Sequence, residues 1–358
     1  EMKECDWSSD VCSSDLFYVQ GGRNMKKRML AVLLAGVMTL GLAACGGSGS
    51  DSKADSKDSG SSDGDINIAV LLKPESNEYW ASMKAGIEDW AKDQDGVSVD
   101  VYCAESEDNI QGQLEQMENI ISKDYDAICA APLSASNLVE GVLKACDAGI
   151  PVVNVDEGID AEAVKEGGGN MVGMYTTDNV LVGQKAAEYI TEQIGSGEVA
   201  IIEGTAGNVT SNDRTKGATD YFESQDGMKV VASQPGDWDR LTSIDVATNI
   251  MQSNPDLKAF YCANDTMALG VYEAVVNAGK QDQVMVVGTD AIANAKESVK
   301  NGEMAATVGQ DNVGIGVACC ELAVKAVKDG WKADPSAEMP VEYIDSFLVT
   351  KDNVDDYL

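Results

Sequence analysis

Short apolar runs alternate with amphipathic stretches along the chain after Asp65. The first three apolar runs cover residues 66–72, 97–104 and 127–130, and the amphipathic stretches that follow them cover residues 79–94, 109–122 and 136–148. The apolar runs are rich in Val, Ile and Ala and do not alternate with polar residues, which is typical of parallel strands buried on both faces by helices. The pattern therefore predicts consecutive βα units.

The same rhythm continues to residue 290. Further strands are predicted at residues 171–175, 199–203, 228–232, 259–263 and 284–290, with a helix from Asn179. These units exceed what one open sheet usually holds, and the Glu-Gly-Gly-Gly-Asn run at residues 166–170 interrupts the pattern. We predict an α/β protein with two doubly wound parallel-sheet lobes. A ligand would then lie between the lobes, at the carboxyl ends of the strands.

The segment ahead of this pattern predicts export. Met25-Lys26-Lys27-Arg28 begins a basic segment, an uncharged apolar run follows, and small residues end it at Ala44. Residues 25–44 are therefore expected to be a signal peptide, since the apolar run is too short to span a bilayer as a helix. The Leu-Ala-Ala-Cys ending resembles a lipobox, in which Cys45 would carry the lipid anchor.

The segments on either side of the predicted signal peptide are expected to lie outside the folded part. Residues 45–65 are almost entirely Gly, Ser, Asp and Lys, so we interpret them as a flexible linker between the lipid and the folded part. Residues 1–24 are polar and acidic and would interfere with an export signal placed after them. We interpret residues 1–24 as a non-native extension.

Composition excludes several kinds of function. Sixty Asp and Glu residues against 26 Lys and Arg give a formal net charge of −34, which makes nucleic acid an unfavourable partner. The chain has no His, which removes the usual nucleophilic triads and most zinc sites. The nine Cys form no CxxC pair, and the six in the predicted folded part, at positions 103, 129, 146, 262, 319 and 320, are interpreted as buried thiols. No glycine-rich phosphate loop joins a strand to a helix, because the triple glycine at 167–169 follows a helix. We expect no catalytic residue, metal or cofactor.

Polar and aromatic residues follow the predicted strands. They are Lys73, Asn77, Tyr79, Trp80, Asp156, Glu157, Arg214, Asp237, Trp238, Asp239, Asn264, Asp265, Asp290 and Gln310. Carboxylate, amide and guanidinium groups match pairs of sugar hydroxyls, and aromatic rings cover the C–H faces of a pyranose. Seven of these residues also have a structural interpretation: Asp156, Asp265 and Asp290 as helix N-caps, Tyr79 and Trp80 as core, and Lys73 and Arg214 as solvated charges.

From Ile66 onward the chain resembles the ribose-type periplasmic sugar-binding proteins of ABC transporters, and in particular the D-allose-binding members of that family. The matching blocks include KPESNEYW (73–80), NVDE (154–157), TTDN (176–179), ASQPGDWDR (232–240), YCANDTMALG (261–270), VVGTD (286–290) and ATVGQ (306–310). The blocks occur in the same order and cover nearly the whole predicted folded part.

The resemblance implies a role for each site residue. Tyr79, Trp80 and Trp238 would sandwich the sugar ring. The hydroxyl-binding positions would be Asn77, Asp156, Arg214, Asn264, Asp290 and Gln310. Lys73 and Glu157 stand where ribose binders carry Ser and Arg, which favours a hexose, with D-allose the expected ligand and ribose or another hexose the alternatives.

The resemblance also implies three chain crossings, near Thr177-Asp178, after Gln310 and near Val341. The lobes would then comprise residues 66–177 plus 311–341 and residues 178–310 plus 342–358, and would close about this hinge on the bound sugar. We expect a monomeric, lipid-anchored extracytoplasmic protein that serves an ABC transporter permease and ATPase.

Three other functions are each compatible with part of the sequence pattern. A carbohydrate-active enzyme would need two facing carboxylates, whereas Asp156 and Glu157 are adjacent and would point to opposite sides of an extended chain. A sugar-sensing regulator would need a basic DNA-binding segment before Ile66, where the chain has an acidic linker. A sensor that presents sugar to a chemotaxis or signalling receptor stays open and is compatible with transport.

Overall fold

The computed structural model describes residues 65–358. The predicted extension, signal peptide, lipidated Cys45 and nearly all of the linker lie outside this part of the chain, and they stay predictions. Within residues 65–358, no helix combines the length and the apolar character needed to cross a membrane.

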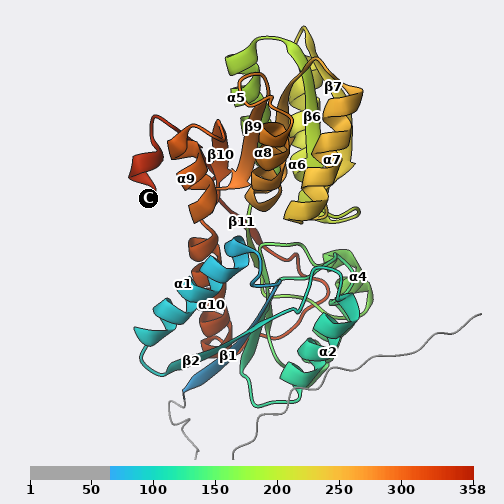
Figure 1. Cartoon of the computed structure of the whole chain (residues 1–358). Coiled ribbons are helices and arrows are strands. Elements are labelled where there is room, and N and C mark those ends of the chain that lie inside the picture. The colour runs from blue at the N-terminus through green and yellow to red at the C-terminus, as the bar shows by residue number, and fades with distance from the viewer. Residues whose placement is uncertain (1–64) are drawn as a thin grey trace, which may run out of the picture. The chain divides into compact units, whose positions relative to one another are not determined.

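The first lobe is built on a parallel sheet of six strands in the order β11-β5-β4-β3-β1-β2 (Figure 1). The strands are β1 (Ile66–Leu72), β2 (Val97–Cys103), β3 (Ala127–Ala130), β4 (Val152–Val155), β5 (Met174–Thr177) and β11 (Val341–Ile344). Its helices are α1 (Glu78–Lys92), α2 (Ile110–Ile121), α3 (Val139–Ala148), α4 (Ala161–Glu166) and α10 (Asn312–Lys328).

The second lobe repeats this plan, with strand order β12-β10-β9-β8-β6-β7. Its strands are β6 (Gly197–Glu203), β7 (Met228–Pro235), β8 (Leu257–Cys262), β9 (Met285–Asp290), β10 (Ala306–Gly309) and β12 (Phe347–Thr350). Its helices are α5 (Asn179–Ile194), α6 (Val209–Ser224), α7 (Arg240–Ser253), α8 (Asp265–Asn277), α9 (Ala293–Asn301) and the short 3₁₀ helix at Val354–Asp356. The edge strand β12 runs antiparallel to β10, whereas the other pairs in this sheet are parallel. The two doubly wound sheets confirm the predicted fold class.

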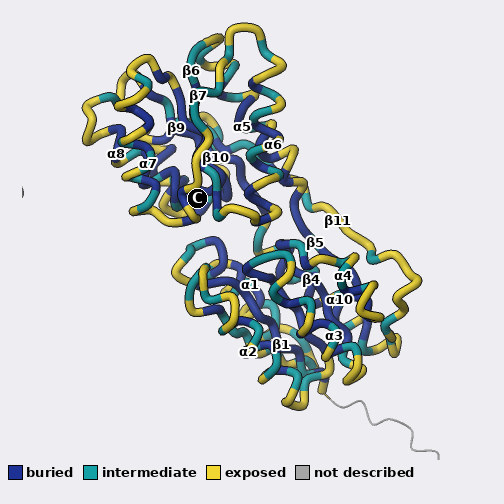
Figure 2. The backbone as a smooth tube through the Cα atoms, turned by 90° about the vertical axis from the view of Figure 1, so that its right-hand side faces the viewer, coloured by how far each residue is buried: buried dark blue, intermediate teal, exposed yellow. Residues whose placement is uncertain are grey.

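Burial on both faces explains why central strands such as β1 lack polar alternation, whereas the edge strand β2 was wrongly predicted to lack it and places Ser98 and Asp100 in solvent. In β1, Ile68, Val70 and Leu72 belong to the core cluster that includes α1 and α10, whereas Ala69 and Leu71 belong to the cluster formed with α2 and α3. Successive side chains of a strand point to opposite faces, so a strand covered on both faces needs apolar residues at every position. Figure 2 shows central strands such as β4 and β9 as buried segments, whereas the edge strand β11 is exposed.

Two glycines hold α5 close to α6 in the second lobe. A Cβ atom at Gly217 would overlap the Val180 carbonyl oxygen, and one at Gly183 would overlap the Arg214 carbonyl oxygen. Only residues without a side chain permit this approach. The packing fixes α6, which carries Arg214, against α5.

The observed chain path corrects two details of the sequence interpretation. The glycine-rich run at 166–170 joins α4 to β5 inside the first lobe and marks no lobe boundary. The third crossing follows Ile344 instead of lying near Val341, because β11 pairs in register with β5 of the first sheet. The chain then enters the second sheet as β12. The other expected lobe boundaries stay predictions.

All six cysteines in the described part are free thiols. Cys129, Cys262, Cys319 and Cys320 are buried, whereas Cys103 and Cys146 are half-buried. The prediction of unpaired thiols is therefore confirmed for these six, and the prediction of burial for four of them.

Candidate functional site

Ten of the eleven predicted ligand-binding residues line one small cavity between the lobes. Lys73, Asn77, Tyr79, Trp80, Asp156 and Glu157 come from the first lobe, and Arg214, Trp238, Asn264 and Asp290 come from the second. The eleventh, Gln310, adjoins them, since its Nε2 donates to Asp290 Oδ1 at 2.6 Å. Most of these residues lie at or just after the carboxyl end of a strand, namely β1, β4, β8, β9 or β10. Asn77, Tyr79 and Trp80 lie at the start of α1, Arg214 lies on α6, and Trp238 lies in the loop after β7. The opposed carboxyl ends of the two sheets thus bring them together.

Arg214 is a fixed, buried cation. Its side chain is only 4% exposed; Nε donates to Asn179 Oδ1 at 2.9 Å and Nη1 donates to the Ala263 carbonyl at 2.6 Å. Nη1 also lies 3.3 Å from Asp290 Oδ1. These partners hold the guanidinium plane in one orientation, so Arg214 is not a solvated surface charge.

Lys73 is equally buried and lies among acidic and aromatic groups. Its Nζ is 3.0 Å from Glu107 Oε2 and 3.3 Å from Glu157 Oε1, and 5.6 Å from the ring centres of both Trp80 and Trp238. Burial lowers the pKa of Lys73, but the Glu157 and Glu107 carboxylates outweigh it and raise that pKa to about 12. Lys73 is therefore a permanent cation beside the aromatic rings.

Glu157 joins the two lobes directly. Its Oε2 accepts from Asn208 Nδ2 at 2.9 Å and from Thr210 Oγ1 at 3.1 Å, both from the start of α6 in the second lobe. Asn208, Thr210 and Glu107 were not among the residues predicted from the sequence. One sequence signal could have located Asn208. It is the N-cap of α6, where its Oδ1 accepts from Ser211 N, and Asn just before a predicted helix is typical of an N-cap.

The interpretation of Asp156, Asp265 and Asp290 as helix N-caps is wrong, but two other site residues do cap helices. Asn77 Oδ1 accepts from Tyr79 N at 3.1 Å and caps α1, and Asn264 Oδ1 accepts from Met267 N at 2.9 Å and caps α8. Their amide Nδ2 atoms form no hydrogen bond within residues 65–358. Asp156 and Asp290 cap no helix. Asp265, the first residue of α8, accepts from the Ile292 N–H at 3.0 Å and does not line the cavity.

Backbone strain is concentrated beside this cavity. Among residues 65–358, the non-glycine residues with positive φ are Asp156 (56°), Asp237 (56°), Trp238 (61°), Asp290 (115°) and Ala291 (56°). Each follows or ends a strand at the cleft. Such conformations cost on the order of 1 kcal/mol or more per residue and recur at functional sites.

The bend at Asp156 corrects one step of the sequence argument. Asp156 and Glu157 were expected to point to opposite sides, yet both line the same cavity. The positive φ of Asp156 takes this residue out of the extended conformation on which that expectation depended. Separation of these two carboxyls is therefore no argument against an enzyme.

Burial also changes the acidity of the site. Burial, with the neighbouring Glu157 carboxylate, raises the pKa of Asp156 to about 7, although Arg214 acts in the opposite direction. Burial raises the pKa of Asp290 to about 6, again against the influence of Arg214. Trp238 Nε1 and Gln310 Oε1 are buried and form no hydrogen bond within the described part of the chain. The site thus offers free donors and acceptors.

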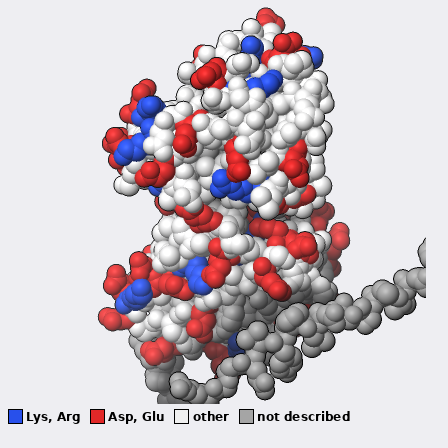
Figure 3. Space-filling view, viewed as in Figure 1, with Lys and Arg blue, Asp and Glu red and all other residues white. Residues whose placement is uncertain are grey.

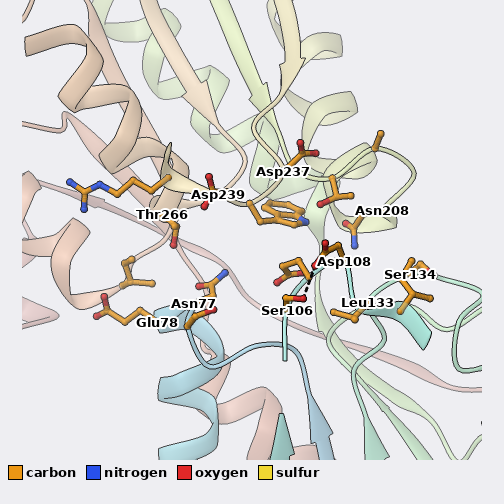
Figure 4. Close-up of a pocket in the computed structure, with 18 of the residues that line it drawn as sticks. Asn77, Glu78, Ser106, Asp108, Leu133, Ser134, Asn208, Asp237, Asp239 and Thr266 are labelled. Carbon is orange, nitrogen blue, oxygen red and sulfur yellow. Dashed lines mark hydrogen bonds between the residues drawn. The ribbon is translucent and has the colours of Figure 1, made fainter. Parts of the chain in front are cut away.

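A second, larger cavity of about 970 Å³ adjoins the first, which measures about 20 Å³. Asn77 and Trp238 line both. Figure 4 shows Ser106, Asp108, Leu133 and Ser134 on the first-lobe side of the larger cavity, and Asn208, Asp237, Asp239 and Thr266 on the second-lobe side. Acidic side chains lie on both lobes beside this hollow (Figure 3).

The protein has two α/β lobes that are linked by three chain crossings, and polar and aromatic groups lie in the cleft between them. This combination is typical of two-lobed solute-binding proteins. Residues 68–331 match the family model described as "Periplasmic binding protein domain". The D-allose-binding periplasmic protein of Escherichia coli is 50% identical over 286 residues, which cover 79% of this chain and 91% of the relative. The D-ribose/D-allose-binding protein of Pseudomonas aeruginosa is 34% identical over 284 residues, which cover 77% of this chain and 88% of that relative.

A solved structure agrees with these relatives. It is a periplasmic solute-binding protein of an ABC transporter from Actinobacillus succinogenes, and it was solved with bound D-allose. It superposes on this chain with a TM-score of 0.75 and is 35% identical in sequence. The match covers 82% of this chain and all of the other chain. The chain belongs to the periplasmic binding protein family, within its ribose-type sugar-binding group. These relatives are binding proteins, so the fold and family place the chain among solute-binding proteins and not among enzymes.

Proposed function

We propose that this protein is the extracytoplasmic sugar-binding component of an ABC importer and that it binds D-allose between its lobes. It would act as a monomer anchored through a lipid on Cys45 and deliver the sugar to a permease and ATPase. One observation carries the proposal: ten residues predicted from the sequence to bind sugar line one buried cavity. The names of the E. coli relative and of the A. succinogenes ligand support D-allose.

The chemistry of the cavity suits a neutral pyranose. Asp156, Asp290 and Arg214 present planar, two-pronged groups that can each bind a pair of neighbouring hydroxyls. Trp80 and Trp238 both lie beside the Lys73 ammonium, and aromatic faces of this kind cover the C–H surfaces of a sugar ring. The free Trp238 Nε1 and Gln310 Oε1 add one donor and one acceptor.

The size of the cavity supports hinge closure. A volume of about 20 Å³ accommodates roughly one water molecule, and a pyranose is several times larger. Sugar entry therefore requires the lobes, or the side chains that fill the cavity, to move apart. The three crossings between the lobes are the natural hinge for such a motion. A transporter could then distinguish the closed, loaded form from the open one.

Isothermal titration of residues 65–358, the part of the chain that the structure describes, tests the proposal. D-Allose, D-ribose, D-galactose, D-glucose and D-xylose should be compared, with allose expected to bind at micromolar Kd or tighter and the others much more weakly. Trp238→Ala should abolish binding. Trp331→Ala, which alters a half-buried Trp outside both cleft cavities, is the control and should bind normally. Absence of binding to every sugar would refute the proposal.

A further inference from the structure

Glu78 makes a contact between the lobes that lies outside the sugar cavity. It is the first residue of α1 in the first lobe, next to Asn77 (Figure 4). Its Oε1 accepts from the backbone N–H of Ala293 and its Oε2 accepts from Asn294 Nδ2, both at 2.8 Å. Ala293 and Asn294 begin α9 of the second lobe. One carboxylate thus receives two hydrogen bonds from the opposite lobe.

Within the described residues, no side chain of the second lobe accepts from the first N–H group inside α9, and Asp265 of that lobe accepts from the N–H of Ile292, which precedes the helix. Its N-cap residue, Ile292, has no side-chain oxygen and makes no capping hydrogen bond. The first N–H groups of a helix need an acceptor, and the positive end of the helix dipole favours a carboxylate there. Glu78 supplies that carboxylate across the cleft, and this is possible only when the lobes are together.

The contact connects two segments that carry proposed sugar-binding residues. Asn77 precedes Glu78, and Asp290 lies three residues before Ala293, with the strained Ala291 between them. Glu78 and Asn294 line the larger cavity, but neither lines the small cavity that holds the proposed sugar site. Glu157 also bridges the lobes but lies inside that site. Within residues 65–358, Glu78 is therefore the cleft residue whose replacement would affect contact between the lobes without removing a group that lines the sugar cavity.

We propose that Glu78 is a positioning residue, a latch that stabilises the closed lobes by capping α9 from the opposite lobe and so slows escape of the sugar. The proposal rests on the sugar-binding function proposed above. Because Glu78 does not line the small cavity, its loss should change how long the lobes stay closed without changing which sugar is preferred.

The test compares full-length wild type with Glu78→Ala, Glu78→Gln and Glu88→Ala. Glu88 is an exposed carboxylate on the same helix with no hydrogen bond or ion pair within the described residues, and it serves as the matched control. D-Allose binding is followed by stopped-flow tryptophan fluorescence. Glu78→Ala should raise Kd about three- to tenfold, almost entirely through faster dissociation, with unchanged sugar preference. Glu78→Gln keeps the shape without the charge and should show a smaller increase.

Two results would contradict the proposed role of Glu78. In the first, D-allose dissociates as slowly from Glu78→Ala as from wild type; in the second, only the association rate constant changes. Thermal unfolding of the sugar-free proteins identifies a general loss of stability, which would also count against a closure role. Small-angle scattering without sugar gives a readout that does not depend on the ligand. A larger mean radius of gyration for Glu78→Ala than for wild type and Glu88→Ala supports the latch even if no sugar binds, and equal radii without sugar contradict it.

Discussion

Replacing Asp156 by Asn should stabilise the sugar-free protein in a way that depends on pH. Burial and the Glu157 carboxylate raise the pKa of Asp156 from 3.8 to about 7. The folded protein therefore holds this proton more tightly than the unfolded chain does. Ionisation of Asp156 then costs folding free energy, and the cost grows as pH rises from about 4 to about 7.

The expected magnitude follows from the pKa difference. A difference of 7 − 3.8, or about three pKa units at about 1.4 kcal/mol each, gives on the order of 4 kcal/mol above pH 7. At pH 5 the cost is only about 1.5 kcal/mol, since the folded protein keeps its proton there. The free energy of unfolding of Asp156→Asn minus that of wild type should therefore increase by about 2–3 kcal/mol between pH 5 and pH 8.

Urea unfolding of sugar-free protein at pH 5 and pH 8, followed by tryptophan fluorescence, measures this difference. Asp290 titrates in the same direction but is present in both proteins, so its contribution cancels to first order. Asp245→Asn alters an exposed carboxylate with no hydrogen bond or ion pair in the described part, and should match wild type at both pH values. An advantage of Asp156→Asn that stays constant or shrinks as pH rises would refute the reasoning. The same variant should lose sugar binding, because Asn replaces one of the two accepting carboxylate oxygens by an NH2 donor and so cannot receive a pair of neighbouring hydroxyls on two oxygens.

Three further changes test the packing around the site. Arg214→Lys keeps the charge but loses the planar fork, and should weaken sugar binding at least tenfold in titration calorimetry, with Asp290 left poorly paired. Gly217→Ala should lower the free energy of unfolding, measured in urea, by about 1–3 kcal/mol, because the added methyl group would overlap the Val180 carbonyl. An unchanged urea midpoint of unfolding would contradict the close contact between α5 and α6. Ala291→Gly should raise that free energy by about 0.5–1 kcal/mol by relieving a positive φ, and destabilisation would argue against strain there.

Much of this protein could be predicted from local patterns. Continuous apolar runs predict strands covered on both faces, and β1 shows the cause, since its alternate residues enter two different cores. The carboxyl ends of parallel strands share one edge of a sheet. Listing the polar and aromatic residues after each strand therefore predicted ten residues that line one cavity.

Tertiary structure alone decided how those residues are held. Glu157 meets Asn208 and Thr210 more than 50 positions away, and Glu78 meets Ala293 at a separation of 215 residues. The positive φ that turns Asp156 into the same cavity as Glu157 is likewise invisible to periodicity. Local sequence sets which face of an element is apolar, whereas contacts between lobes depend on how two separately folded sheets meet across the cleft. The sequence alone thus determines the lobes and the chemistry at their strand ends, and only the tertiary structure determines which of these groups face one another.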